Sequence, residues 1–200
     1  MERIRQARTA GTAGIVVGLL WLLNWTFEAF VDPPVGGGGW YAGQTLATVA
    51  LFGTAVLLFG LAALHPAGDG RVARAFLALN WVAWLSLTLG GIGLLIRGDE
   101  SDGPMTVFFP IGGILGTLSL LVSGVLVAVR RRLPGWRRWA VLAFAVMYLL
   151  LGFLNGGSDE PTAASQAGEL VQYLLLLVLA VAVRTAAPVG ADTAAPPVRV

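Results

Sequence analysis

The sequence predicts an all-α fold: a polytopic integral membrane protein built as a bundle of six transmembrane helices. Three observations support this prediction. Hydrophobic residues make up 56% of the chain and charged residues only 12%, and the mean hydropathy is +0.78, well above that of a soluble domain. Apolar runs recur six times, at or near the length of about 20 residues that crosses a bilayer as helix. Short connections rich in glycine, proline and charge separate these runs.

The six spans are expected at residues 10–30, 40–64, 74–96, 105–129, 136–154 and 163–183. The first follows the basic start MERIRQAR, and no convincing cleavage site comes after it. We therefore interpret it as an uncleaved span rather than a signal peptide. The connections are short, which favours antiparallel packing of consecutive helices. Residues 1–184 would form one six-helix transmembrane domain, and residues 185–200, which offer little bulk for a core, a disordered cytoplasmic tail.

The distribution of arginine predicts the orientation of the chain. All 13 basic residues are arginines. With a cytoplasmic amino terminus, 12 of them fall on the cytoplasmic side and only Arg97 falls outside. Such a bias in short loops is the positive-inside signal, so we expect both termini to be cytoplasmic. The frequent use of Ala, Gly, Val, Arg and Pro is typical of GC-rich coding sequences and points to the plasma membrane of a prokaryote.

The segment VRRRLPGWRRW at residues 129–139 contains five arginines and raises the question of nucleic-acid binding. Because it joins the fourth span to the fifth, we interpret it as a cytoplasmic loop. Arg130–Arg138 is expected to contact anionic lipid head groups, with Trp136 and Trp139 in the interfacial aromatic belt. No nucleic-acid partner is expected.

Composition excludes several kinds of chemistry. The chain has no cysteine and a single histidine, His65, which excludes disulfides, thiolate metal sites and bis-histidine haem ligation. It has no lysine either, which excludes Schiff-base chemistry. His65 precedes a proline at the predicted end of the second span and is interpreted as a helix-ending residue. We expect no catalytic residue, no metal site and no cofactor.

The outer halves of the spans contain more polar residues than the inner halves. Asn24 and Glu28 close the first span, Gln44 lies near the start of the second, and Gln172 and Tyr173 lie in the outer half of the sixth. Spacings of three and four residues place such side chains on single helix faces. We therefore predict an outward-facing polar cup that binds a small ligand, with these five residues as candidate ligand-binding residues.

Glu169 is the candidate for a carboxylate inside the membrane. From Glu169 to Arg184 is 15 residues, about 22 Å of helix, which is shorter than the roughly 30 Å of hydrocarbon. Unless Arg184 extends to the head groups, Glu169 is drawn into the membrane, where ionisable residues usually have a partner. Arg97 is the expected partner, and both residues join the candidate ligand-binding set. The acidic residues favour a small cationic ligand, whereas a glutamate facing head groups or water is the alternative.

Glycine and proline predict close packing in some places and irregular helices in others. Gly14 with Gly18, and the two outer glycines of GGILG at residues 112–116, are spaced four apart, which favours close approach of helices. Pro110 lies within the fourth predicted span, and the GGIG sequence at residues 90–93 lies in the third. Because proline removes a helical hydrogen bond, we expect irregular backbone at this level. Such backbone is tolerated where it lines a cavity.

Three functions are compatible with the sequence, and no motif identifies a family. The first is a small binding or transport-type protein that uses the outer polar cup. The second is a structural or accessory subunit without its own site, acting in an oligomer or with a partner membrane subunit. The third is a membrane-embedded enzyme. We favour the first because the polar residues gather at one level, although the inner halves of the spans offer no polar path for transport.

Overall fold

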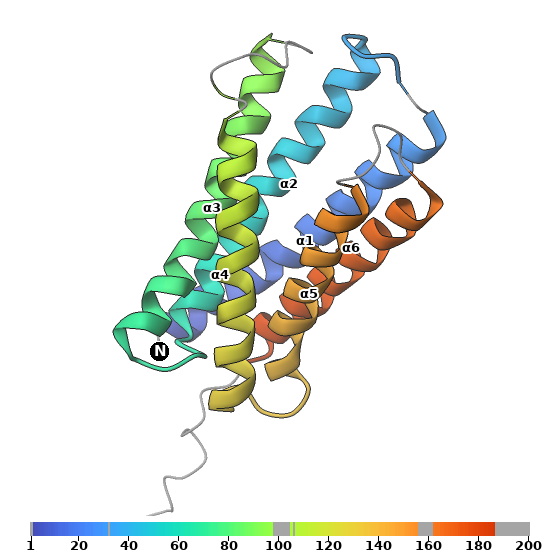
Figure 1. Ribbon diagram of the computed structural model, residues 1–200. Coiled ribbons are helices and arrows are strands. Elements are labelled where there is room, and N and C mark those ends of the chain that lie inside the picture. Colours follow the sequence, from blue (N-terminus) through green and yellow to red (C-terminus); the bar gives the residue numbers. More distant parts are fainter. Residues whose placement is uncertain (1, 32, 98–104, 106, 156–161, 187–200) are drawn as a thin grey trace, which may run out of the picture.

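The computed structural model describes residues 2–31, 33–97, 105, 107–155 and 162–186, and this part of the chain forms six helices (Figure 1). They are α1 (Glu2–Val31), α2 (Gly38–Ala63), α3 (Arg71–Arg97), α4 (Phe108–Arg130), α5 (Arg137–Asn155) and α6 (Ala163–Arg184). All six are long and apolar enough to cross a membrane. The predicted all-helical architecture, with six helices able to span a membrane, is therefore confirmed.

The observed helix bounds lie close to the predicted ones, with one exception. The exception is α1, which begins at Glu2 and so includes the basic start of the chain, whereas the first span was predicted from residue 10. At every other end the difference is at most three residues. Residues 187–200 of the predicted tail lie outside the described residues.

The helices form a ring in chain order (Figure 1). Each helix packs against the next one, and α1 packs against α6 to close the ring. A smaller contact joins α2 to α6 across the ring. Consecutive helices run antiparallel, as expected for short connections. In either direction round the ring, two helices separate α3 from α6.

Small residues let α1 pack closely against its neighbours. A Cβ on Gly14 would lie 2.7 Å from Cδ1 of Leu57 in α2 and 3.0 Å from Cβ of Ala180 in α6. A Cβ on Gly18 would overlap the side chain of Leu177. The predicted packing role of this glycine pair is therefore confirmed, because a larger side chain at either position would displace Leu57, Ala180 or Leu177 on the neighbouring helices.

The outer parts of α3 and α4 are continuous helix, so the prediction of irregular backbone there is wrong. Pro110 is the third residue of α4, in the first turn, where backbone N–H groups have no acceptor within the helix. Its missing N–H therefore breaks no helical hydrogen bond. The glycines of α3 serve packing instead: Gly90 lies against the ring of Phe109, and Gly91 lies against Thr48.

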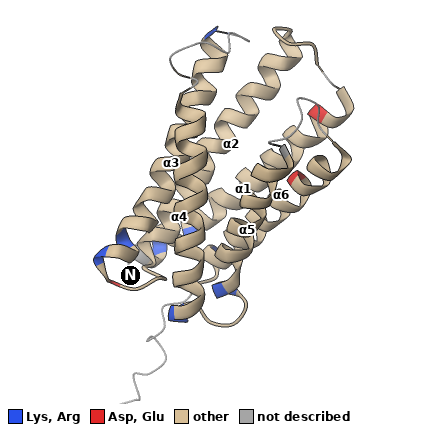
Figure 2. Ribbon diagram, viewed as in Figure 1, with Lys and Arg blue, Asp and Glu red and all other residues tan. Residues whose placement is uncertain are grey.

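The two ends of the bundle differ in charge, as Figure 2 shows. The arginines of the described residues gather at one end, where α1, α3 and α5 begin and α2, α4 and α6 end; we call this the arginine end. Arg97 is the exception, because it is the last residue of α3 and lies at the opposite end, which we call the far end. The pattern is the one that the arginine distribution in the sequence predicts.

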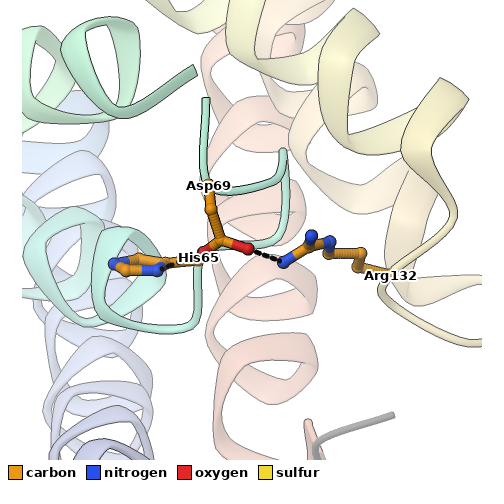
Figure 3. A network of polar contacts seen from close by, with 3 residues as sticks. All are labelled: His65, Asp69 and Arg132. Carbon is orange, nitrogen blue, oxygen red and sulfur yellow. Dashed lines mark hydrogen bonds and ion pairs between the residues drawn. The ribbon is translucent and has the colours of Figure 1, made fainter. Parts of the chain in front are cut away.

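At the arginine end, Asp69 links the α2–α3 connection to the α4–α5 connection (Figure 3). One carboxylate oxygen lies 3.0 Å from Nδ1 of His65, and the other accepts a hydrogen bond of 2.8 Å from Nη1 of Arg132. Arg132 first, and His65 second, lower the pKa of the Asp69 carboxyl by hydrogen bonding to its charged form. His65 follows the end of α2 with a φ of 49°, which confirms it as a helix-ending residue. Its contact with Asp69 was not predicted.

Candidate ligand-binding site

A cavity of about 350 Å³ lies inside the ring, and all six helices contribute to its wall. It is lined by Trp21, Gln44, Ala47, Thr48, Leu51, Trp84, Leu87, Gly91, Leu94, Phe109, Phe144, Tyr148, Gln172, Tyr173 and Leu176. Most of these residues lie in the second halves of α1, α3 and α5 and in the first halves of α2, α4 and α6. The cavity therefore belongs to the far half of the bundle, away from the arginine end. We call it the aromatic cavity.

Six of the fifteen residues that line this cavity are aromatic. Trp21 of α1 stacks on Tyr173 of α6, with centroids 5.1 Å apart and planes at 7°. Trp84 of α3 packs against Phe144 and Tyr148 of α5, with centroid distances of 6.2 and 5.6 Å. The rings hold one another in place, so the cavity is preformed, as small-molecule sites usually are. Its lining is mainly apolar, with aromatic and aliphatic side chains, which differs from the polar cup expected from the sequence.

Two polar atoms in the wall lack hydrogen-bond partners. The indole N–H of Trp21 does have a partner, because Nε1 donates a hydrogen bond to Oγ1 of Thr54 at 3.3 Å. Trp84 and Gln172 are only 3% and 7% exposed, yet within the described part of the chain Trp84 Nε1 and Gln172 Oε1 are unpaired. An unpaired buried polar group costs about 1–3 kcal/mol. Two residues that line the cavity thus each carry one buried, unsatisfied polar atom, a donor in Trp84 and an acceptor in Gln172.

A second cavity, of about 440 Å³, adjoins the first. One wall belongs to α4 and the other to α5 and α6, and we call it the side cavity. Tyr148, Gln172 and Tyr173 line both cavities. Glu169 lines the side cavity and is half-buried there, one helical turn before Tyr173. The two spaces are therefore neighbours that meet at three side chains.

The structure brings together four of the seven predicted ligand-binding residues. Gln44, Gln172 and Tyr173 line the aromatic cavity, and Glu169 lines the side cavity next to it. They come from α2 and α6, which touch across the ring. Four of the predicted residues therefore line cavities, and their role in ligand binding stays a prediction.

The other three predicted residues line neither cavity. Asn24 is buried beside Gly43 of α2 and donates from Nδ2 to Oε1 of Glu28 at 2.9 Å, while Glu28 itself is exposed. Arg97 is exposed at the end of α3, and it lines neither cavity. The structure does not bring Arg97 to Glu169, because two helices separate α3 from α6 in the ring.

The sequence did not predict most of the aromatic residues that line the aromatic cavity. Trp84, Phe109, Phe144 and Tyr148 sit in apolar segments where rings suit lipid, interface and cavity equally well. One signal was present: Phe144 and Tyr148 are four residues apart, which places them on one helix face. That spacing indicates an aromatic face but not the direction in which the face points.

No family model, curated protein or solved structure matches this chain. Within the residues that the structure describes, His, Asp and Glu side chains form no group of three that could hold a metal ion.

Proposed function

We propose that this chain is an integral membrane protein that binds a small, uncharged ring compound carrying a hydroxyl group. The observation behind the proposal is the pair of atoms Trp84 Nε1 and Gln172 Oε1, both buried, both unpaired among the described residues, and both on residues that line the aromatic cavity. Small-molecule sites are typically apolar, with a few polar groups that orient the ligand. The aromatic cavity has this composition.

A hydroxyl group suits both unsatisfied atoms. Its oxygen accepts a hydrogen bond from an indole N–H, and its hydrogen is donated to an amide oxygen. A flat ring suits the wall, because aromatic rings pair well in offset-stacked or edge-to-face arrangements. The volume of about 350 Å³ is at the lower end of the range of about 300–1,000 Å³ for ligand pockets. The part of the ligand inside the cavity is therefore small.

The proposed orientation has both termini in the cytoplasm of a prokaryotic cell and the aromatic cavity in the outer half of its plasma membrane. The support is the gathering of arginines at one end (Figure 2) and the positive-inside rule. The arginine end would then meet anionic lipid head groups. There the guanidinium carbons of Arg137 and Arg138 lie 5.9 and 5.2 Å from the ring centroids of Trp136 and Trp139.

A small cation is the second candidate ligand. The aromatic rings favour it, because a cation over a ring face gains about 0.5–2 kcal/mol, and Glu169 in the side cavity adds a carboxylate nearby. The aromatic cavity itself, however, has no carboxylate among its described lining residues. An uncharged ligand is therefore our first choice.

Binding is proposed in preference to transport. Transport needs a polar route through the arginine half of the bundle. Asn80 and Ser123 are buried in that half, and Nδ2 of Asn80 donates to Oγ of Ser123 at 3.0 Å. This single contact between α3 and α4, in which Oδ1 of Asn80 stays unpaired among the described residues, does not make a polar route.

Thermal unfolding of the purified protein in lipid nanodiscs tests the proposal. We expect naphthol to raise the Tm more than naphthalene, which has the same rings without the hydroxyl group. Gln172→Leu should remove this advantage of naphthol. Gln166→Leu is the matched control, because Gln166 lies on α6 and lines neither cavity, and it should preserve the advantage.

Other outcomes favour other functions. Stabilisation by benzyltrimethylammonium that is lost in Glu169→Gln would establish a cation site instead. Equal stabilisation by naphthol and naphthalene, or none by either, would overturn the proposal and favour an accessory subunit without its own site.

A further inference from the structure

The side cavity opens toward the lipid-facing surface of the bundle. On α4 it is lined by Pro110 and Ile114, which are exposed, Ile114 to 62%. On α5 it is lined by Gly152, which is also exposed. In a bilayer this outward surface of the helices meets the hydrocarbon chains. The side cavity is therefore an opening between α4 and α5 that faces the lipid.

Glycines keep this opening wide. A Cβ on Gly113 or on Gly152 would find no atom within 4 Å. At the arginine end the same two helices are close, since a Cβ on Gly124 would lie 2.8 Å from Cα of Leu142. α4 and α5 thus diverge from the arginine end toward the far end, as Figure 1 shows.

Inward, the side cavity ends at the aromatic cavity. Tyr148, Gln172 and Tyr173 form the boundary, since they line both spaces. Glu169 precedes Gln172 by three residues on α6, so the two side chains share one helix face. Polar groups therefore lead from the opening to the unsatisfied Oε1 of Gln172.

We propose that the ligand is an amphiphile bound from the bilayer, with a hydroxyl-bearing ring in the aromatic cavity and an alkyl chain in the side cavity. This inference rests on the function proposed above. The ring matches the aromatic wall and the unpaired atoms of Trp84 and Gln172. The alkyl chain of the ligand matches the side cavity, because this cavity adjoins the aromatic cavity and opens to the hydrocarbon of the bilayer, which is an apolar medium like the alkyl chain itself. One ligand of this kind fills both cavities.

The test compares two probes, para-nonylphenol with an alkyl chain and naphthol without one. Each is titrated against the protein in nanodiscs, and thermal stabilisation gives the half-saturating concentration. Gly113→Leu fills the side cavity at a position that has room for a side chain. It should raise the value for para-nonylphenol about tenfold, because the leucine side chain takes the space of the alkyl chain and overpacks the side cavity, and leave the value for naphthol unchanged.

Gly38→Leu is the matched control. Gly38 also has no atom within 4 Å of its Cβ position, and it lines neither cavity, so both probes should bind as they do to the unaltered protein. If naphthol fails to stabilise the unaltered protein, the proposed function itself is refuted. If naphthol binds but Gly113→Leu leaves para-nonylphenol binding unchanged, only the amphiphile inference is refuted. Should Gly113→Leu fail to purify, Gly152→Leu fills the same opening from α5. The expected and the refuting results for para-nonylphenol and naphthol are then the same as for Gly113→Leu.

Discussion

Replacing Gln172 with leucine should stabilise the ligand-free protein and weaken ligand binding at the same time. Gln172 is 7% exposed, and its Oε1 is unpaired among the described residues. A buried acceptor in this state costs about 1–3 kcal/mol. Leucine has a similar size and carries no polar atom to satisfy. We therefore expect the free energy of unfolding to rise by about 1 kcal/mol or more.

Thermal unfolding in nanodiscs without ligand measures the first effect, because 1 kcal/mol moves the Tm of a chain of this size by roughly 2–4 °C. A naphthol titration measures the second. Loss of one hydrogen bond, worth about 0.5–1.5 kcal/mol, should weaken naphthol binding about twofold to tenfold. Gln166→Leu should change neither quantity. A Gln172→Leu variant that is less stable and binds naphthol normally would refute the reasoning, because Oε1 would then be neither unsatisfied nor in contact with the ligand.

Packing, charge and orientation give three further predictions. Gly14→Ala should lower the Tm, because overpacking costs about 1–3 kcal/mol, whereas Gly113→Ala, in open space, should not. Asp69→Asn should lower the Tm above about pH 4 and not well below it, because the partners of this carboxylate depress its pKa and its stabilising contribution is lost on protonation. A cysteine at Asp102 should react with an impermeant maleimide outside intact cells, and one at Pro134 should not; the reverse labelling would contradict the orientation.

The six helices could be predicted because crossing a bilayer imposes a length and an apolarity that composition reveals directly. The effect of Pro110 could not, because it depends on where the helix begins. With the predicted start at residue 105, Pro110 would be a sixth residue and would break a hydrogen bond. With the observed start at Phe108 it falls in the first turn and breaks none. A shift of three residues thus reverses the conclusion.

The site could be predicted only where a residue conflicts with its surroundings. Gln44 and Gln172 are polar groups in apolar helices, so the sequence marks them. Trp84 and Tyr148 suit a lipid-facing surface as well as a cavity, and only the closure of the ring by α1 and α6 decides which faces turn inward. The same ring order places Arg97 away from Glu169. Short connections predict that consecutive helices pack together, but they do not reveal that α1 closes the ring against α6.

Photolabelling with an azidonaphthol tests the central claim most directly, because it reports where the ring binds. The probe is irradiated with the protein in nanodiscs, and the labelled residues are identified by mass spectrometry. We expect label on residues of the aromatic cavity from several helices, such as Trp21, Trp84 and Tyr148, and loss of that label when excess naphthol competes. Label confined to lipid-facing side chains such as Phe153, which is 76% exposed, and unaffected by naphthol would contradict the claim that the aromatic cavity is a binding site.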